Sequence, residues 1–324
     1  MSKISFVILN YKTYEESIAC AESILAIREG AEVQIVIVDN GSGNASVAQL
    51  RKHFADEPTV HVLAAPENLG FARGNNLGIR YAREQFDPDF VVAANSDILF
   101  EQSDYCRQLT EIYEERPYAI LGGDIVDASR TQHFNPVARE RRYTLNYMRR
   151  QVAVSWAKAV MFRFIKLFHL KKTVTGHYGI ATDETGADVR DGSRNLTTRE
   201  VDGKSVAADS RIEEEMEDVV LHGCCLVFSR DFFAELDGFW DGTFLYAEEE
   251  ILYYLAKKKG LRVLYSPRVT CVHKEAVTTN TLYRDFVDAK IFYFSRITKS
   301  YRAFLGLMKD SEKQGKDDKA IDIR

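Results

Sequence analysis

Residues 91–100 read VVAANSDILF, an apolar run typical of a buried β-strand that stops abruptly at Asn95-Ser96-Asp97. Around this run, the first 130 residues alternate short β-branched runs with longer segments whose apolar residues recur at helical spacing. The predicted strands are ISFVIL (4–9), VQIVIV (33–38), TVHVLA (59–64), DFVVAA (89–94) and YAILGG (118–123). Because strands that alternate with helices are joined by right-handed crossovers, the pattern predicts an α/β fold with a Rossmann-like, mainly parallel central sheet flanked by helices.

The composition is that of a globular protein, with 45% hydrophobic and 28% charged residues among 324. A formal net charge of -5 provides no general attraction to nucleic acid, so we expect no nucleic-acid partner. The apolar run near the N-terminus is too short for a signal peptide, and no run approaches the roughly 20 apolar residues that cross a bilayer. These features predict a cytoplasmic protein. The five cysteines show no C-x-x-C spacing, and we expect buried thiols rather than disulfides or a zinc site.

The alternating pattern breaks at residues 131–218, which we interpret as a helical and loop insertion. Its acidic and polar second part, 183–218, is predicted to be a mobile or hairpin-like loop. Order resumes at 219–280, with a helix and a strand pair around LRVLYSPRVTCVH (261–273). Residues 281–308 predict an amphipathic helix, and the charged residues 309–324 predict a disordered tail.

In a sheet of this kind ligands bind beyond the carboxyl ends of the strands, where polar residues gather in this sequence. Asp39 and Asn40 end the second strand, and the Asp39 carboxylate could accept hydrogen bonds from a nucleobase or ribose; a simple turn that caps the next helix is the alternative. The segment ENLGFARGNN (67–76) follows the third strand and leads into a helix. The N-terminal N–H groups of such a helix favour anions, which indicates a phosphate-binding segment.

Asp97 ends the fourth strand and is a candidate ligand for Mg²⁺ or Mn²⁺ that bridges to a diphosphate. Asn95 and Ser96 add only neutral oxygens, so the phosphates of a nucleotide would have to complete the coordination of the ion. His273 ends the strand RVTCV and is a candidate second metal ligand, with a structural histidine as the alternative.

The segment FLYAEEEILYYLAKKKG (244–260) begins a helix with three consecutive glutamates. Some of these complement the helix dipole from solvent. The aromatic residues Phe244 and Tyr246 just ahead of them indicate that the turn borders a cleft. Neighbouring carboxylates raise one another's pKa, which suits one glutamate to act as a general base.

The order of these motifs resembles that of the family 2 glycosyltransferases of the GT-A fold, particularly a bacterial branch with rhamnosyltransferase-like enzymes that build surface polysaccharides. The resemblance covers about 1–130 and 219–280. It rests on VILNY (7–11), VDNGSGNAS (38–46), NLGFARGNN (68–76), NSD (95–97), HGCCLVFSRDFF (222–233), GFWDGTFLYAEEE (238–250) and VLYSPRVTCVH (263–273).

The resemblance implies an inverting transfer of a sugar from a UDP- or dTDP-linked donor to a hydroxyl of a glycan or lipid-linked glycan, in the synthesis of a cell-surface or capsular polysaccharide. It also implies that Glu249 is the catalytic base, that Glu248 supports it or binds the acceptor, and that Asp97 and His273 hold Mn²⁺ or Mg²⁺. The catalytic domain would span 1–308, with 1–130 as the nucleotide-sugar half and 219–280 as the acceptor half. The residues expected to contact the nucleotide sugar are Asn10, Asp39, Asn40, Asn68, Gly70, Phe71, Arg73, Asn75, Asn76, Asn95 and Ser96.

Three positions depart from the family pattern, because Asn95 replaces the first Asp of a D-x-D motif, Glu249 replaces Asp, and Ala247 replaces Gly or Asp. The motif Asn95-Ser96-Asp97, with its single carboxylate, leaves open a pseudo-glycosyltransferase that binds a nucleotide sugar or glycan without turnover. A sugar-1-phosphate nucleotidyltransferase is a further alternative. It would carry a Gly-rich basic loop after the first strand, where this chain has LNYKTYEE (9–16).

The basic segment 138–172 lies outside the matching motifs and carries ten Lys and Arg against the single acidic residue Glu140. Its part VSWAKAVMFRFIKLFHLKK (154–172) predicts a helix with an aromatic, apolar face and a cationic rim, as expected for docking to an anionic membrane. Such a peripheral contact would place the protein at the inner face of the plasma membrane, near a lipid-linked acceptor. A helix buried against the sheet or in a homodimer is the alternative.

Overall fold

The computed structural model of the chain describes residues 1–137, 143–168, 198–201, 204–207, 213–274 and 286–321. The chain divides into two compact units, which are described separately. The first unit consists of Met1–Arg141, Gly192–Trp240 and Glu248–Thr278. The second consists of Arg142–Asp191, Asp241–Ala247 and Thr279–Arg324. The basic helix therefore belongs to the second unit, whereas the end of the predicted insertion, from residue 192 onward, belongs to the first.

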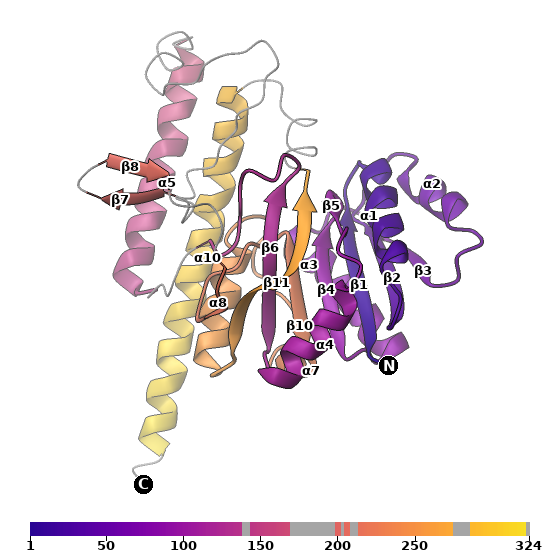
Figure 1. The fold of residues 1–324 in the computed structure, drawn as a ribbon. Helices are drawn as coiled ribbons and strands as arrows, with labels where there is room; N and C mark the ends of the chain where they lie inside the picture. The colour runs from indigo at the N-terminus through magenta and orange to yellow at the C-terminus, as the bar shows by residue number, and fades with distance from the viewer. Residues whose placement is uncertain (138–142, 169–197, 202–203, 208–212, 275–285, 322–324) are drawn as a thin grey trace. The chain divides into compact units, whose positions relative to one another are not determined.

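The first unit is built on one sheet, to which nine strands contribute within the described residues (Figure 1). These strands are β1 (Lys3–Asn10), β2 (Glu32–Asp39), β3 (Val60–Ala64), β4 (Phe90–Asn95), β5 (Ile98–Leu99), β6 (Ile120–Asp127), β9 (Met216–Glu217), β10 (Cys225–Ser229) and β11 (Val263–His273). Their order is β3-β2-β1-β4-β10-β6-β11-β5, and β9 pairs with β11 outside this path. The neighbours among β1, β2, β3 and β4 are parallel, as are β6 and β11. The predicted mainly parallel sheet is confirmed.

Helices cover both faces of this sheet. The helices of the unit are α1 (Tyr14–Ala26), α2 (Ser46–His53), α3 (Phe71–Phe86), α4 (Tyr105–Glu115), α7 (Arg230–Phe233) and α8 (Glu248–Lys258). The alternation of β1 sends Ile4, Phe6 and Ile8 into one large apolar core, to which α1, α2 and α4 also contribute. Helix α3 packs on the opposite face, against β1, β2 and β4.

Glycines let α3 approach the sheet closely. A Cβ atom at Gly78 would lie 2.4 Å from Cγ1 of Val7, and one at Gly74 would lie 2.6 Å from Cδ1 of Leu9. Any larger residue at these positions would therefore lift the helix from β1. This packing sets the N-terminus of α3 beside the carboxyl ends of β1 and β2.

One strand takes a place in the sheet that the sequence did not predict, and another differs from its prediction. The fifth predicted strand, β6, does not pair with β4, because β10 inserts between them and runs antiparallel to both. The predicted strand pair at 261–273 is wrong, since Val263–His273 is a single strand, β11, with a register shift between Ser266 and Thr270. A register shift bends the strand locally. The residues at such a bend give the same sequence pattern as a turn between two strands.

A hairpin in the first unit lies within the acidic loop. Strands β7 (Thr198–Val201) and β8 (Lys204–Ala207) pair antiparallel, apart from the main sheet. The hairpin-like character predicted for 183–218 is confirmed for these strands, while 183–197, 202–203 and 208–212 lie outside the described residues.

The second unit contains two helices that pack against each other, α5 (Leu145–Leu167) and α10 (Phe286–Ile321). The Thr298 hydroxyl donates to Oγ of Ser155 over 2.9 Å, and the rings of Phe162 and Phe294 stack at 5.6 Å. Within the part of the chain that the structure describes, neither helix nor any other is both long and apolar enough to span a bilayer.

The charged residues 309–321 are helical, although the sequence predicts disorder there, and 322–324 lie outside the described residues. Helix α10 continues from the predicted amphipathic segment as far as Ile321. Lys, Glu, Gln and Ala are good helix formers, and Asp310 and Lys313 form an ion pair one turn apart, so a polar segment can extend an existing helix without nucleating one.

Candidate active site at the carboxyl edge of the sheet

The carboxyl ends of β1 and β2 hold a buried carboxylate in a network of polar side chains. Asn10 and Asp39 are in register on the two strands, and Nδ2 of Asn10 donates to Oδ2 of Asp39 over 2.7 Å. The N–H of Ser42 donates to the other oxygen over 3.1 Å, and Ser17 donates to Oδ1 of Asn10. Asp39 is therefore held in one orientation, and Asn10, predicted to contact the nucleotide, is placed where it supports Asp39.

A second network joins the loop after β2 to the N-terminus of α3. The Asn40 side chain accepts from the N–H of Leu69 at 3.0 Å and donates to the carbonyl of Gly70 at 3.1 Å. Oδ1 of Asn68 accepts from the N–H of Gly70. Gly70, the residue before the helix, has a φ of 83° and makes no capping bond with a side chain. The helix thus begins without the side-chain cap that usually accepts its first N–H groups, as a phosphate-binding helix requires.

Asparagines further along α3 bond within the protein. Asn75 is buried and donates to the carbonyl of Phe71. Asn76 donates to the carbonyl of Phe239 over 2.7 Å and accepts from its N–H over 2.8 Å. The side chain of Asn76 was predicted to contact the nucleotide, but here it connects α3 to the loop that contains Gly238. Arg73, near the start of the helix, is exposed.

Asp97 and His273 meet at the end of β4. The short strand β5 directly after Asp97 pairs antiparallel with the end of β11, so that His273 lies opposite Ile98. Nε2 of His273 lies 3.3 Å from Oδ1 of Asp97. Nδ1 of His273 is buried and has no hydrogen-bond partner among the described residues. Ser96 contacts Thr13 through its hydroxyl, at 3.3 Å, and Asn95 is partly buried beside it.

His222 was not predicted as a site residue, although it lies in the motif LHGCC (221–225). It precedes β10, which runs beside the end of β4, and its ring centre lies 6.0 Å from that of His273. Burial, assisted by the neighbouring His273, lowers the pKa of His222 to about 4, against an opposing effect of Asp97. His222 is therefore neutral near pH 7. In the sequence, the only sign that His222 belongs to the site is its place between two apolar segments. The pairing of β10 with β4 is what brings it close to His273.

The three glutamates open α8 and are not all exposed. Glu248 is buried, and Glu249 and Glu250 are partly buried. A Cβ atom on Gly223 would lie 3.6 Å from Oε2 of Glu249, which puts this carboxylate beside the motif that contains His222. Burial raises the pKa of the Cys224 thiol most, followed by the effects of Cys225, Asp97 and Glu249.

The backbone just before Glu248 adopts an unusual conformation. Tyr246 has a φ of 75° and Ala247 a φ of 70°, values that cost energy for residues with a side chain. In the second unit the preceding segment is held to α10, since Arg296 stacks on the ring of Phe244 and Tyr246 packs on Tyr293. Such strain is often found at functional sites.

Among the described residues, no group of three or more His, Cys, Asp and Glu side chains is arranged to hold a metal ion. Asp97 and His273 form a set of two. They provide a carboxylate and an imidazole, which suit Mn²⁺ or Mg²⁺ when oxygens from a ligand complete the shell. The buried and unpartnered Nδ1 of His273 is consistent with this use. The residues present thus fit a divalent ion that is bound together with a diphosphate.

Ligands of open α/β sheets bind beyond the carboxyl ends of the strands, and there this chain has a buried carboxylate, an uncapped helix start and an Asp–His pair. A family model described as "Glycosyl transferase family 2" matches residues 5–174, more than half of the chain. The chain belongs to this family.

One curated relative is the "Low-salt glycan biosynthesis hexosyltransferase Agl10" of Haloferax volcanii, 28% identical over 127 residues. The match covers 39% of this chain and 38% of that protein. The fold is similar to that of a mannosyltransferase from Pyrobaculum calidifontis, solved in complex with GDP-Man and Mn²⁺, with a TM-score of 0.50 and 14% identity over 94% of this chain and 70% of that one. A structure of S. aureus TarS (residues 1–349) has a TM-score of 0.43 and 14% identity over 85% of this chain and 58% of that one. The predicted GT-A fold is confirmed.

Proposed function

We propose that this protein is an inverting glycosyltransferase that moves a sugar from a nucleotide-diphosphate sugar to a hydroxyl of a glycan or lipid-linked glycan. The observation that supports this most is the gathering of three groups at one edge of one sheet: the buried Asp39, the pair Asp97–His273, and Glu249. The name of the curated relative, a hexosyltransferase of glycan biosynthesis, agrees with this class of reaction. Cell-surface or capsular polysaccharide synthesis remains the pathway that we propose.

Each group would have a distinct task. Asp39 accepts hydrogen bonds from the nucleoside, in an orientation that Asn10 and Ser42 already set. The N–H groups at the start of α3 face the diphosphate. Glu249 takes the proton of the acceptor hydroxyl as its oxygen bonds to the anomeric carbon, and the bond from that carbon to the phosphate oxygen breaks, so the nucleoside diphosphate leaves with the electron pair. Glu248 supports Glu249 or orients the acceptor.

A divalent ion would be held by Asp97 and His273 together with the donor's phosphates. When bound, such an ion supplies positive charge that stabilises the leaving diphosphate. Mn²⁺ is the first candidate because the similar mannosyltransferase was solved with it. Asn95 stands where the family often has Asp. The protein would therefore offer the ion only one negatively charged ligand, the carboxylate of Asp97.

The first test is a thermal-shift screen of UDP, dTDP, GDP and CDP, each with and without Mn²⁺. A ligand at 100 times its Kd stabilises the native state by about 2.7 kcal/mol, so the matching nucleotide should raise the Tm by roughly 5 °C. We expect UDP or dTDP to do this only with Mn²⁺. The Asp97→Asn variant should lose the contribution of Mn²⁺. No shift for any nucleotide would contradict the proposal.

A pseudo-glycosyltransferase is the second candidate, favoured by Asn95 in place of an acidic residue. It would bind a nucleotide as tightly as an enzyme does but would not turn it over. Slow, Mn²⁺-dependent hydrolysis of the donor sugar to water distinguishes the two, since an intact transferase site usually allows some transfer to water. Release of nucleoside diphosphate above the uncatalysed rate would support the enzyme.

We also propose that helix α5 docks on an anionic membrane surface, where a lipid-linked acceptor resides. One face of α5 packs on α10 through Ser155 and Phe162, and Met148 and Ala159 are also buried. The remaining face exposes large apolar side chains, with Trp156 at 54% and Phe164 at 55% exposure. The others are Val154, Met161, Leu167 and, just beyond the helix, Phe168.

The charge of α5 suits this partner. The helix carries Arg149, Arg150, Lys158, Arg163 and Lys166 and has no acidic residue. Basic residues near an anionic membrane contribute about 1 kcal/mol each, and aromatic side chains insert at the interface. Two of these basic side chains bond to α10, since Lys166 pairs with Asp288 and Arg163 donates to Ser295, while 169–172 lie outside the described residues.

Co-sedimentation with vesicles tests this surface. The protein should pellet with phosphatidylcholine vesicles that contain 30% phosphatidylglycerol, bind pure phosphatidylcholine much less, and dissociate in high salt. Trp156→Asp with Phe164→Asp should abolish binding, whereas the matched Trp156→Leu with Phe164→Leu should retain most of it. Binding unaffected by the Asp variant would contradict docking through α5. A dimer that the Asp variant converts to a monomer, with no vesicle binding, would instead assign the face to a homodimer.

A further inference from the structure

The register shift in β11 lies between the core of the sheet and the candidate metal site. Before the shift, Ser266 pairs with Gly123 of β6, and after it Thr270 pairs with Asp124. The intervening residues, 267–269, therefore have no register partner on β6, and Pro267 lacks a backbone N–H. The carbonyl oxygen of Val269 lies 2.3 Å from where a Cβ of Gly123 would be, so this bulge packs tightly on a glycine.

The side chain of Gln102 joins the bulge to the segment that follows β5. Its Nε2 donates to the carbonyl of Arg268 over 2.8 Å, and its Oε1 accepts from the N–H of Thr270 over 2.8 Å. A carboxamide has the same donor and acceptor as a peptide group. Gln102 thus acts as a substitute for one residue of a strand and extends the antiparallel pairing between β5 and β11.

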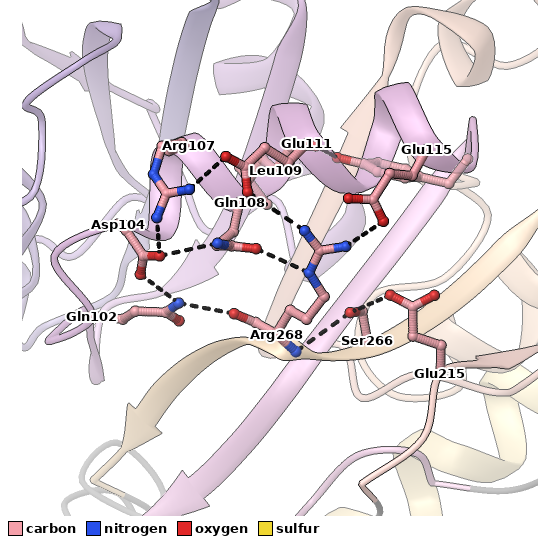
Figure 2. Close-up of polar contacts among 11 residues, drawn as sticks. Gln102, Asp104, Arg107, Gln108, Leu109, Glu111, Glu115, Glu215, Ser266 and Arg268 are labelled. Carbon is pink, nitrogen blue, oxygen red and sulfur yellow. Dashed lines mark hydrogen bonds and ion pairs between the residues drawn. The ribbon is translucent and has the colours of Figure 1, made fainter.

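Other polar side chains hold this junction in place, as Figure 2 shows. Nε2 of Gln102 also donates to Asp104, the residue before α4, over 2.8 Å. The guanidinium of Arg268 reaches α4, where Nε donates to Gln108 over 3.0 Å and Nη1 to Glu115 over 2.6 Å. On the other side Ser266 donates to Glu215. These bonds are partly exposed and individually weak, whereas Gln102 bonds directly to the backbone of the bulge.

The register beyond the bulge determines where His273 lies. Three pairings follow in order: Val272 opposite Leu99, His273 opposite Ile98, and the N–H of Lys274 bonded to the carbonyl of Asp97 over 3.0 Å. A slip of one residue in a strand sends each side chain to the other face. In such a slip His273 would point away from Asp97, and the 3.3 Å contact between them would be lost.

We propose that Gln102 is a positioning residue for the metal site: together with the pairing of 270–273 on β6, its carboxamide holds β11 in the register in which His273 faces Asp97. This inference rests on the proposed function, in which these two residues hold the divalent ion of the donor complex. Gln102 itself touches neither the ion nor the nucleotide, and acts only through the backbone of β11.

Two variants remove the link in different ways. Gln102→Met keeps the length of the side chain and loses both bonds to the backbone. Gln102→Glu loses the donor, leaves the Arg268 carbonyl unpaired and sets a negative charge beside Asp104. Gln49→Glu, on the exposed surface of α2, is the control for the change in charge.

The first readout is hydrogen exchange of the metal-free protein. Peptides that contain 97–100 and 271–274 should exchange at least tenfold faster in both Gln102 variants, while peptides from β1 and β2 and the whole of Gln49→Glu should be unchanged. Unchanged exchange of the β5 and β11 peptides would overturn the proposal without any reference to the metal.

The second readout is the affinity for Mn²⁺ in the presence of UDP or dTDP, measured by calorimetry in four proteins. We expect Gln102→Met to weaken Mn²⁺ binding at least tenfold in the wild-type background and less than twofold in the His273→Ala background, because it acts through His273. A general loss of stability would weaken binding equally in both backgrounds, and such additivity would overturn the positioning role.

The outcomes separate the two proposals. A wild-type protein that binds no Mn²⁺ with any nucleotide overturns the metal part of the proposed function and this inference with it. A wild-type protein that binds Mn²⁺, with Gln102 variants that bind it equally well, overturns this inference alone.

Discussion

Asp39 and Glu249 differ in how tightly their surroundings hold them. Both oxygens of Asp39 accept hydrogen bonds from within the sheet edge, from Asn10 and Ser42, so this carboxylate is fixed before any ligand arrives. Glu249 is partly exposed at the start of α8, beside the small residue Gly223. A rigid side chain suits the proposed role of Asp39, which is to bind the nucleoside in one orientation. An accessible side chain suits the proposed role of Glu249, which must reach the acceptor hydroxyl to take its proton.

Replacing Glu249 with Gln tests its role as the base. The change keeps the size and removes the capacity to take a proton, so turnover should fall by about 10²–10⁴-fold. Nucleotide affinity, measured by calorimetry, should stay within about twofold because in our proposal the nucleotide contacts Asp39 and the start of α3 rather than Glu249. Glu250→Gln, the next residue on α8, is the matched control and should retain activity. Comparable turnover in the Glu249 variant would remove it from the role.

His222 should make the protein less stable in acid. Its pKa in the folded protein is about 4, against 6.5 for an ordinary histidine, because of burial and the neighbouring His273. Below pH 6.5 the unfolded chain binds a proton that the folded one does not, so the stabilising difference is present above pH 6.5 and is lost as the pH falls toward 4. The loss is at most about 3 kcal/mol, and smaller to the extent that water reaches the ring.

Urea unfolding between pH 7 and pH 4 measures this effect. In His222→Gln, which cannot titrate there, the free energy of unfolding should fall less over this range than in the wild type. An identical fall in both proteins would mean that other groups account for the acid dependence.

At the scale of elements, the approach of two loops shapes the nucleotide side of the edge. Gly41 has a φ of 67°, and a Cβ atom there would lie 2.2 Å from the backbone carbonyl carbon of Glu67. Two backbones are thus in contact, and no change of rotamer can relieve a clash between them. Only glycine lets the loop after β2 reach the loop before α3, where Asn40 bonds to Leu69 and Gly70.

Gly41→Ala should therefore reduce stability by about 2 kcal/mol or more and abolish nucleotide binding. Gly43→Ala is a matched control, because Gly43 has a φ of 65° and no heavy atom within 4 Å of an added Cβ. This control should lose about 1 kcal/mol from backbone strain and keep its nucleotide affinity. Equal effects of the two substitutions, in urea unfolding and calorimetry, would show that the contact between the loops is unimportant.

Element prediction succeeded where patterns were local. The first four strands and the helices between them follow from β-branched runs and helical spacing, and each strand lies within a few residues of its predicted place. The strand pair predicted at 261–273 was wrong, and the place of β10 in the sheet was not predicted. Neither the insertion of β10 between β4 and β6 nor the bulge in β11 has a local signal, because each depends on partners far away in the sequence.

At the scale of the whole molecule, charge is unevenly distributed. The chain has a net charge of -5, yet α5 carries five basic residues and no acidic one. The sum therefore hides the one surface for which we propose an anionic partner. The net charge argues against a general attraction to nucleic acid. The local basic surface on α5 can be recognised only when the helix and its exposed side are known.

The sequence by itself determined the fold class, the family and the positions of Asp39, Asp97, Glu249 and His273 at the ends of elements, because these depend on local pattern and on the order of motifs along the chain. Only the tertiary structure decided which of these residues lie together. It placed His222 beside His273, directed Asn10 and Asn76 to bonds within the protein, and revealed Gln102 as a link between β5 and β11. Such placements depend on strand order, register and close packing between distant segments, and no short stretch of sequence records them.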